Sequence, residues 1–246
     1  MERNPVALVV GAGDYIGAAI SRRFAAGGYT VCMGRRNGEK LDPIVREIED
    51  AGGCAHGYSL DAREETQVQR VFETIENDVG ALDIVIFNVG GNVSFPIRDT
   101  TTRVFTKVWQ MACLAGFFTG REAANYMVPR QRGSIFFTGA TASLRGGNGY
   151  AAFASAKSGL RALAQSMARE LGPDNIHVAH LVIDAGVDTQ WVRDWMRKNK
   201  GVDAAQLPQD TLMNPASVGE AYWNLHHQSR DAWTFEMDIR PFREHW

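Results

Sequence analysis

The chain has 246 residues, 45% of them hydrophobic, and a formal net charge of -2. This length suffices for one sizeable core, and the near-neutral charge argues against nucleic acid as a partner, since proteins that bind phosphate backbones carry a basic excess. The apolar run at 6–10 is too short for a signal-peptide core or a membrane span, so we expect no membrane partner.

Short apolar runs alternate with longer amphipathic stretches along the chain. The runs are rich in Val, Ile and Phe and predict strands at 5–10, 29–34, 54–60, 82–90, 133–139 and 176–184, with a last edge strand at 233–239. The stretches between them predict helices at 15–27, 39–51, 64–78, 103–128, 150–171 and 215–228. The alternation predicts an α/β fold, a Rossmann-type doubly wound parallel β-sheet in a single domain over 1–246.

The region 191–215 is the least regular of the chain and places charges around Trp191 and Trp195. In a doubly wound sheet this region lies beyond the carboxyl edge, where ligands bind and lids form. We expect a substrate loop or lid here. The alternative is a solvated connector with two packed tryptophans.

The segment VALVVGAGDYIGAAISRRFA, 6–25, is typical of a strand, a glycine turn and a helix. Gly11 can make the tight turn that leaves the strand, and Gly17 lets the helix pack against it. The backbone N–H groups at the helix start, around Ile16, would hold a pyrophosphate. The segment predicts a dinucleotide site, and the alternative is a turn that only packs.

This arrangement resembles the short-chain dehydrogenase/reductase family. The family's Gly-x-x-x-Gly-x-Gly turn corresponds here to Gly11, Tyr15 and Gly17, so a tyrosine replaces the middle glycine, which normally lets the backbone approach the phosphates. The Tyr15 ring must either turn aside or occupy part of the phosphate site. Gly13 relieves some of this crowding.

The end of the second strand, MGRR (33–36), indicates which dinucleotide is bound. An acidic residue there would accept hydrogen bonds from the ribose 2′-OH and favour NAD. Arg35 and Arg36 instead suit a 2′-phosphate, so NADP(H) is the preferred cofactor and NAD(H) the alternative. Arginines at a strand end can also be simply solvated.

The resemblance covers most of the chain and implies further cofactor contacts. Asp61 stands where the family's aspartate contacts the adenine amino group. Asn88 and Gly90 keep two positions of the family's Asn-Asn-Ala-Gly segment. Thr189 matches the threonine beside the nicotinamide, with Ala185 in place of the neighbouring proline.

The family's catalytic pattern is only partly present. Lys157 keeps the lysine that holds the ribose and lowers the pKa of the family's tyrosine, which is a general acid/base. Phe153, Ala140 and Cys113 stand at the tyrosine, serine and asparagine positions, so the usual carbonyl–alcohol mechanism is not intact. Nearby hydroxyls that could orient a substrate instead belong to Thr138, Thr141 and Ser143.

A second spacing points to Tyr150, seven residues before Lys157 and on a similar helix face. It resembles the Tyr-x₆-Lys pattern of the divergent enoyl-acyl-carrier-protein reductases, in which the tyrosine stabilises an enolate oxygen. Those enzymes have a further tyrosine where Ala140 stands and a different cofactor turn. Tyr150 and Lys157 are therefore the candidate catalytic pair, and core packing is the alternative role for Tyr150.

Three hypotheses follow for function. The first is an NADP(H)-dependent oxidoreductase acting on a small carbonyl or activated-alkene substrate. The second is a cofactor-binding pseudoenzyme or sensor without hydride transfer, and the third is a pocket for another small molecule with the phosphate site closed by Tyr15. The resemblance also implies a homodimer or homotetramer formed through the helices 103–128 and 150–171. Cys32, Cys54 and Cys113 lack paired or metal-binding spacing, which predicts a reduced, cytoplasmic protein with no metal site.

Overall fold

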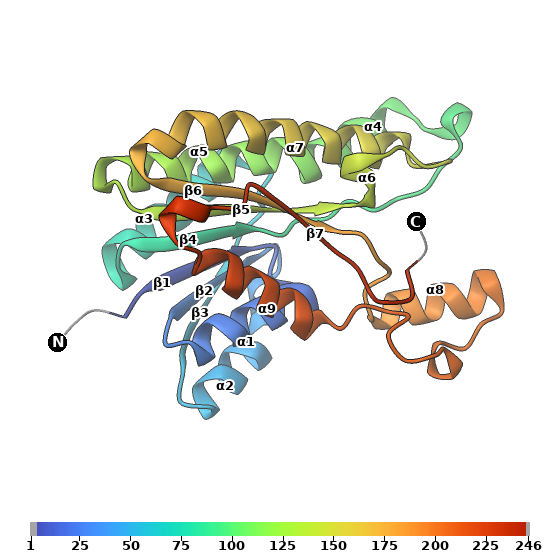
Figure 1. The fold of residues 1–246 in the computed structure, drawn as a ribbon, viewed down its shortest axis with the longest axis horizontal. Helices are drawn as coiled ribbons and strands as arrows, with labels where there is room; N and C mark the ends of the chain where they lie inside the picture. Colours follow the sequence, from blue (N-terminus) through green and yellow to red (C-terminus); the bar gives the residue numbers. More distant parts are fainter. Residues whose placement is uncertain (1–3, 245–246) are drawn as a thin grey trace.

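Seven parallel strands form one sheet in the order β3-β2-β1-β4-β5-β6-β7 (Figure 1). The computed structural model describes residues 4–244. The strands are β1 Val6–Val10, β2 Thr30–Arg35, β3 Cys54–Ser59, β4 Leu82–Phe87, β5 Gly133–Ala140, β6 Ile176–Ile183 and β7 Glu236–Ile239. The predicted doubly wound parallel sheet is confirmed.

Helices cover both faces of the sheet (Figure 1). One face carries α1 (Ile16–Ala26), α2 (Asp42–Asp50) and α9 (Pro215–His226), which share one buried hydrophobic cluster with the sheet. The other face carries α3 (Glu65–Thr74), α5 (Ala115–Met127) and α7 (Ala151–Leu171), which share a second cluster. Every residue of β1, β4 and β6 is buried, as strands covered on both faces require.

The chain order places a ligand crevice between β1 and β4. From β1 the chain adds β2 and β3 on one side of the sheet, and β4 then begins the other side. The connections that leave β1 and β4 therefore turn toward opposite faces, which opens a crevice at their carboxyl ends.

The long predicted helix at 103–128 is divided into three parts. It consists of α4 (Thr102–Trp109), a π-helical turn (Gln110–Leu114) and α5. Residues 75–79, at the end of the predicted helix 64–78, form a second π-helical turn. Wide turns of this kind are frequent at functional sites, and the first of them carries Cys113.

The region 191–215 is more regular than expected, because α8 spans Gln190–Lys200. The hydroxyl of Thr189 accepts a hydrogen bond from Val192 N (3.1 Å), and Gly201 ends the helix with a φ of 64°. None of the α8 residues is buried, although Trp191, Val192, Trp195 and Met196 recur at helical spacing on one side of the helix. Figure 1 shows α8 at one side of the molecule, apart from the sheet.

Two further properties concern residues 4–244 as a whole. No helix in this part of the chain is long and apolar enough to cross a bilayer. The same residues include no group of three or more histidine, cysteine, aspartate or glutamate side chains placed to hold a metal ion.

Candidate active site

Two cavities lie side by side at the carboxyl ends of the strands. The β2 cavity, of about 500 Å³, extends from the glycine turn toward the end of β2. The β5 cavity, of about 520 Å³, extends over the end of β5 and the start of α7. Asn88, Val89 and Gly90, which follow β4, line both cavities. The two cavities therefore form one bipartite cleft at the β1–β4 crevice.

The glycine turn after β1 is shaped by close contacts that exclude side chains. Gly11 has a φ of 87°, and a Cβ there would lie 2.8 Å from Asn88 O. At Gly17 a Cβ would lie 2.5 Å from Ala12 Cα, so this glycine permits the tight packing of α1. Nothing lies within 4 Å of a Cβ placed on Gly13, which lines the β2 cavity. The turn thus leaves open space in front of its backbone, as a bound phosphate requires.

Tyr15 points away from this space. Its hydroxyl accepts a hydrogen bond of 2.9 Å from Gln190 N at the start of α8. The side chain is 38% exposed and lines neither the β2 cavity nor the β5 cavity. The ring has turned aside and leaves the phosphate site open. The third hypothesis, in which Tyr15 closes this site, is therefore not supported.

The β2 cavity is strongly basic. Four cationic side chains line it, together with a single acid, Asp61: they are Arg35, Arg36, Lys40 and Arg63. Two of these are paired, because Arg35 Nη1 donates to Asp14 Oδ1 (2.7 Å) and Arg63 Nε donates to Asp61 Oδ1 (2.9 Å). Within residues 4–244, Arg36 and Lys40 form no ion pair, and both are exposed. The cavity therefore presents uncompensated positive charge.

Asp61 lies in the β2 cavity as expected, but its carboxylate is already occupied. The hydrogen bond from the Arg63 guanidinium lowers its pKa below the usual range. Sequence reasoning missed Arg63, two residues further on in SLDARE, and also Lys40. The available signal was that both are basic residues close in sequence to a predicted site residue, Lys40 to Arg35 and Arg63 to Asp61. The family's pattern includes neither position.

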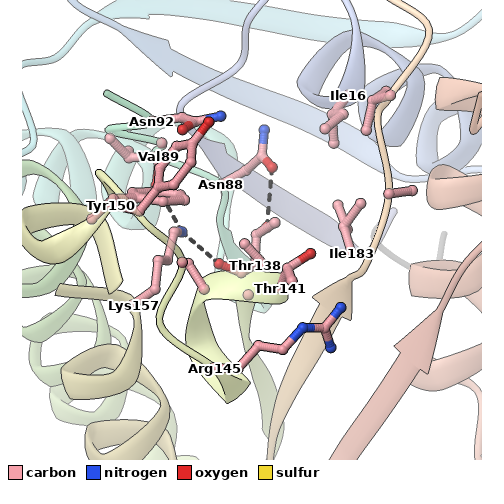
Figure 2. Close-up of a pocket in the computed structure, with 18 of the residues that line it drawn as sticks. Ile16, Asn88, Val89, Asn92, Thr138, Thr141, Arg145, Tyr150, Lys157 and Ile183 are labelled. Atoms are coloured by element: carbon pink, nitrogen blue, oxygen red, sulfur yellow. Dashed lines mark hydrogen bonds between the residues drawn. The ribbon is translucent and has the colours of Figure 1, made fainter. Parts of the chain in front are cut away.

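Lys157 reaches into the β5 cavity from α7, and its ammonium bridges two strand ends. Nζ donates to Thr138 O (2.7 Å) and to Val89 O (3.2 Å), as the dashed lines in Figure 2 show. Burial lowers the pKa of Lys157 to about 8. The ring of Phe153 lies 6.0 Å from Nζ and covers one side of it.

Tyr150 lies at the N-cap of α7 and lines the same cavity as Lys157. The structure thus brings the two candidate catalytic side chains to one wall. In Figure 2 the phenol hydroxyl of Tyr150 lies toward Asn92, which follows β4. No hydrogen bond from residues 4–244 reaches this hydroxyl, so it is available to a ligand.

A family model described as short chain dehydrogenase matches residues 5–200. The chain belongs to this family. It is 55% identical to a short-chain dehydrogenase from Rhodopseudomonas palustris of known crystal structure, with a TM-score of 0.83 over 98% of this chain and 100% of that one. It is 30% identical over 177 residues to 2-dehydro-3-deoxy-D-gluconate 5-dehydrogenase of Formosa agariphila, covering 72% of this chain and 67% of that protein. A metagenomic short-chain oxidoreductase solved in complex with NADP has the same fold, with 23% identity and a TM-score of 0.81 over 97% and 98% of the two chains.

The three positions at which this short-chain dehydrogenase departs from the family's pattern carry no replacement acid. Ala140 and Phe153 line the β5 cavity without a polar side-chain atom. Cys113 is buried in the π-helical turn, and burial raises its thiol pKa. The hydroxyl of Ser143 accepts a hydrogen bond from Ala140 N (3.1 Å) and thus satisfies the backbone.

Thr138 belongs to a buried chain of hydrogen bonds that the sequence did not reveal. Tyr222 on α9 donates to Thr138 Oγ1 (2.7 Å), which in turn donates to Asn88 Oδ1 (3.0 Å). Asn88 Nδ2 then donates to Gly11 O (3.1 Å). The chain runs from α9 through β5 to the glycine turn, so the Thr138 hydroxyl positions Asn88 and is not free to orient a substrate.

Most residues predicted to bind the cofactor line the cleft. They are Gly11, Gly13, Arg35 and Asp61 in the β2 cavity, Ile16 and Lys157 in the β5 cavity, and Asn88 and Gly90 in both. Gly17 lies behind the turn as a packing residue. The structure places Thr189 outside both cavities, where its hydroxyl caps α8.

Proposed function

We propose that this chain is an NADP(H)-dependent oxidoreductase that acts on a small carbonyl or activated-alkene substrate. One observation carries the proposal: a basic cavity and a mainly apolar cavity join at Asn88, Val89 and Gly90. A dinucleotide with an extra phosphate at one end and a flat nicotinamide ring, uncharged in its reduced form, at the other needs a cleft of this kind.

The residues present fit such a cofactor. The open space at Gly13 and the tight turn at Gly11 let phosphates approach the backbone. Arg36 and Lys40 are exposed cations with no ion pair among the described residues, and they suit the 2′-phosphate. The bound cofactor supplies or accepts the hydride. The NADP complex of the metagenomic relative, which has the same fold, agrees with this choice.

The chain's own contribution to the chemistry comes from Lys157 and Tyr150. Two of the three ammonium protons of Lys157 are donated to backbone carbonyls, which leaves one for a ribose hydroxyl. The phenol of Tyr150, which has no hydrogen-bond partner among residues 4–244, donates a hydrogen bond to the oxygen on which negative charge develops. The Phe153 ring lies 6.0 Å from the ammonium and has no proton to donate.

Cofactor binding without hydride transfer is the second candidate. It is favoured by the absence of an acid at Phe153, Ala140 and Cys113, among which the thiol is buried and its pKa is raised. A turnover assay distinguishes the two functions, because both predict cofactor binding and only the first predicts hydride transfer.

The first test is a thermal-shift and fluorescence titration with NADPH, NADP⁺, NADH and NAD⁺. A ligand at about 100 times its Kd stabilises the fold by about 2.7 kcal/mol. Arg36→Ser should weaken NADPH binding about tenfold and leave NADH binding unchanged. The exposed Arg46 on α2 provides the control, Arg46→Ser. Failure of all four dinucleotides to bind would overturn the proposal.

The second test measures NADPH oxidation with a panel of aldehydes, ketones and enones. Tyr150→Phe should lower kcat by about 100-fold with the NADPH Kd within twofold of the wild-type value. Tyr126→Phe, on α5 and outside both cavities, is the matched control. Unchanged turnover in Tyr150→Phe contradicts its role, and tight binding without turnover in the wild type identifies the cofactor-binding protein.

We also propose that a second copy of the chain covers α4 and α5, giving a homodimer or homotetramer. Phe105, Trp109 and Phe117 on these helices are 39%, 39% and 38% exposed, so an apolar row is left open. Trp109→Glu should shift the mass measured by light scattering toward the monomer. Trp191→Glu on α8, the control, should not.

A further inference from the structure

Among the described residues, the charged side chains that line the β5 cavity are all basic. Among the described residues that line it, two are basic, Arg145 and Lys157, and none is acidic. Lys157 is 3% exposed and its ammonium is held by two carbonyls. The charge that a substrate meets in the open part of the cavity is therefore the guanidinium of Arg145, whose side chain is 51% exposed.

The position of Arg145 is fixed at both ends of its side chain. It follows the short helix α6 (Thr141–Leu144), and its backbone N–H donates to Thr141 O (3.1 Å). At the other end Nη2 lies 3.5 Å from Asp184 Oδ1. Figure 2 shows Arg145 beside Thr141, with its guanidinium near the end of β6 at Ile183.

Asp184 holds this guanidinium without blocking it. Its carboxylate is buried, accepts a hydrogen bond from Thr141 Oγ1 and lies 3.9 Å from a second guanidinium, that of Arg240. Asp184 does not line the cavity, so a ligand meets the arginine and not the carboxylate. Nε and Nη1 of Arg145 have no hydrogen-bond partner among residues 4–244.

We propose that Arg145 is a specificity residue that selects substrates carrying a carboxylate. A guanidinium presents parallel N–H groups that match the two oxygens of a carboxylate, and the partly closed cavity strengthens the contact. The carboxylate lies at Arg145, and the reacting carbon lies between it and the Tyr150 hydroxyl. The substrates are thus small oxo acids or unsaturated acids. This assignment rests on the proposed function for the reaction, and only on the cavity for the anion site.

The first experiment compares acids with their uncharged esters in the NADPH oxidation assay. The pairs are 2-oxo-2-phenylacetate and 4-oxopentanoate, each with its methyl ester. Arg145→Met should raise KM for the acids by about 10- to 100-fold, leave kcat within twofold, and leave both constants for the esters unchanged. Arg145→Lys, which keeps the positive charge and loses the parallel N–H groups of the guanidinium, should give an intermediate KM. Arg46→Met is the control.

The second experiment measures binding without turnover. Phenylacetate and phenylacetamide are titrated against the protein with NADPH present, by cofactor fluorescence, and without it, by thermal shift. Phenylacetate should bind at least tenfold more tightly than the amide to the wild type and equally weakly to Arg145→Met. A carboxylate preference without turnover of any compound supports the anion site and rejects the oxidoreductase. Turnover with equal KM for acids and esters in both proteins overturns the anion site and leaves the oxidoreductase in place.

Discussion

The hydroxyl of Tyr15 accepts a hydrogen bond of 2.9 Å from the backbone N–H of Gln190, which joins the N-cap of α1 to the first residue of α8. The other hydrogen bonds described for α8 stay within 188–203. Because α8 buries none of its residues, this contact is a main link between the helix and the cofactor turn. The tyrosine that replaces the family's glycine therefore holds the start of α8.

Tyr15→Phe should loosen α8 without unfolding the protein. The ring is kept and one hydrogen bond is lost, so the free energy of unfolding should fall by no more than about 1.5 kcal/mol. Trypsin should cut several-fold faster at the basic residues of α8, since local opening governs cleavage. Tyr126→Phe should leave the cleavage rate unchanged. Equal rates in all three proteins would mean that other contacts hold α8.

Two alanine substitutions in the glycine turn should differ in their effect on the free energy of unfolding. Gly11→Ala forces a Cβ onto a backbone with a φ of 87° and to within 2.8 Å of Asn88 O, so it should cost about 1–3 kcal/mol. Gly13→Ala meets nothing within 4 Å and should change stability by less than about 1 kcal/mol. Urea unfolding of the two variants measures the difference. Equal midpoints would show that the turn is not strained.

The buried chain from Tyr222 to Asn88 can be tested by a double-mutant cycle. Thr138→Val leaves the Tyr222 hydroxyl without its acceptor and Asn88 Oδ1 without its donor, and should cost about 2–3 kcal/mol. Tyr222→Phe alone should cost about 1 kcal/mol. In the Thr138→Val background, Tyr222→Phe should be neutral or stabilising, because it removes an unpaired buried hydroxyl. Additive costs would mean that the two hydroxyls are not coupled.

Two histidines, the buried His180 and the partly buried His226, predict acid sensitivity. Burial lowers the pKa of His226 to about 3 and that of His180 to about 4. Below pH 6.5 the unfolded chain gains protons that the folded chain does not, so stability is complete above this pH and falls as the pH approaches these values. At pH 5 each histidine should account for about 2 kcal/mol of lost stability.

The measurement for this prediction is urea unfolding at pH 7 and pH 5. His226→Gln should reduce the difference between the two pH values by about 2 kcal/mol. His56→Gln, at an exposed position of β3, should leave it unchanged. A wild-type protein with the same stability at both pH values would contradict the assignment of buried neutral histidines.

The sheet was predictable from sequence because buried strands produce continuous apolar runs and the covering helices carry apolar stripes. Helix α8 was missed although Trp191, Val192, Trp195 and Met196 recur at helical spacing, because the charged residues between them lower the mean hydropathy of the segment. Its start at Thr189 and its end at Gly201 were further signals. Capping residues and periodicity together would have identified this exposed helix.

The site was predictable where short motifs carry it. Gly11 and Asn88 follow strands, and Lys157 lies on a helix face at a fixed spacing, so sequence alone placed them at one edge. Thr138 and Tyr222 are 84 positions apart, and only the tertiary fold shows that they touch. The pairing of Arg145 with Asp184 across 39 positions was hidden in the same way.

The two carbonyls held by Lys157 lie just past the point at which β4 and β5 stop pairing, at Phe87 and Phe137. Beyond that pair, the ammonium joins the two strand ends, as the hydrogen bond between Thr138 and Asn88 also does. Lys157 therefore has a structural role at this seam in addition to its place in the cleft. That role does not depend on a proton donor at Phe153.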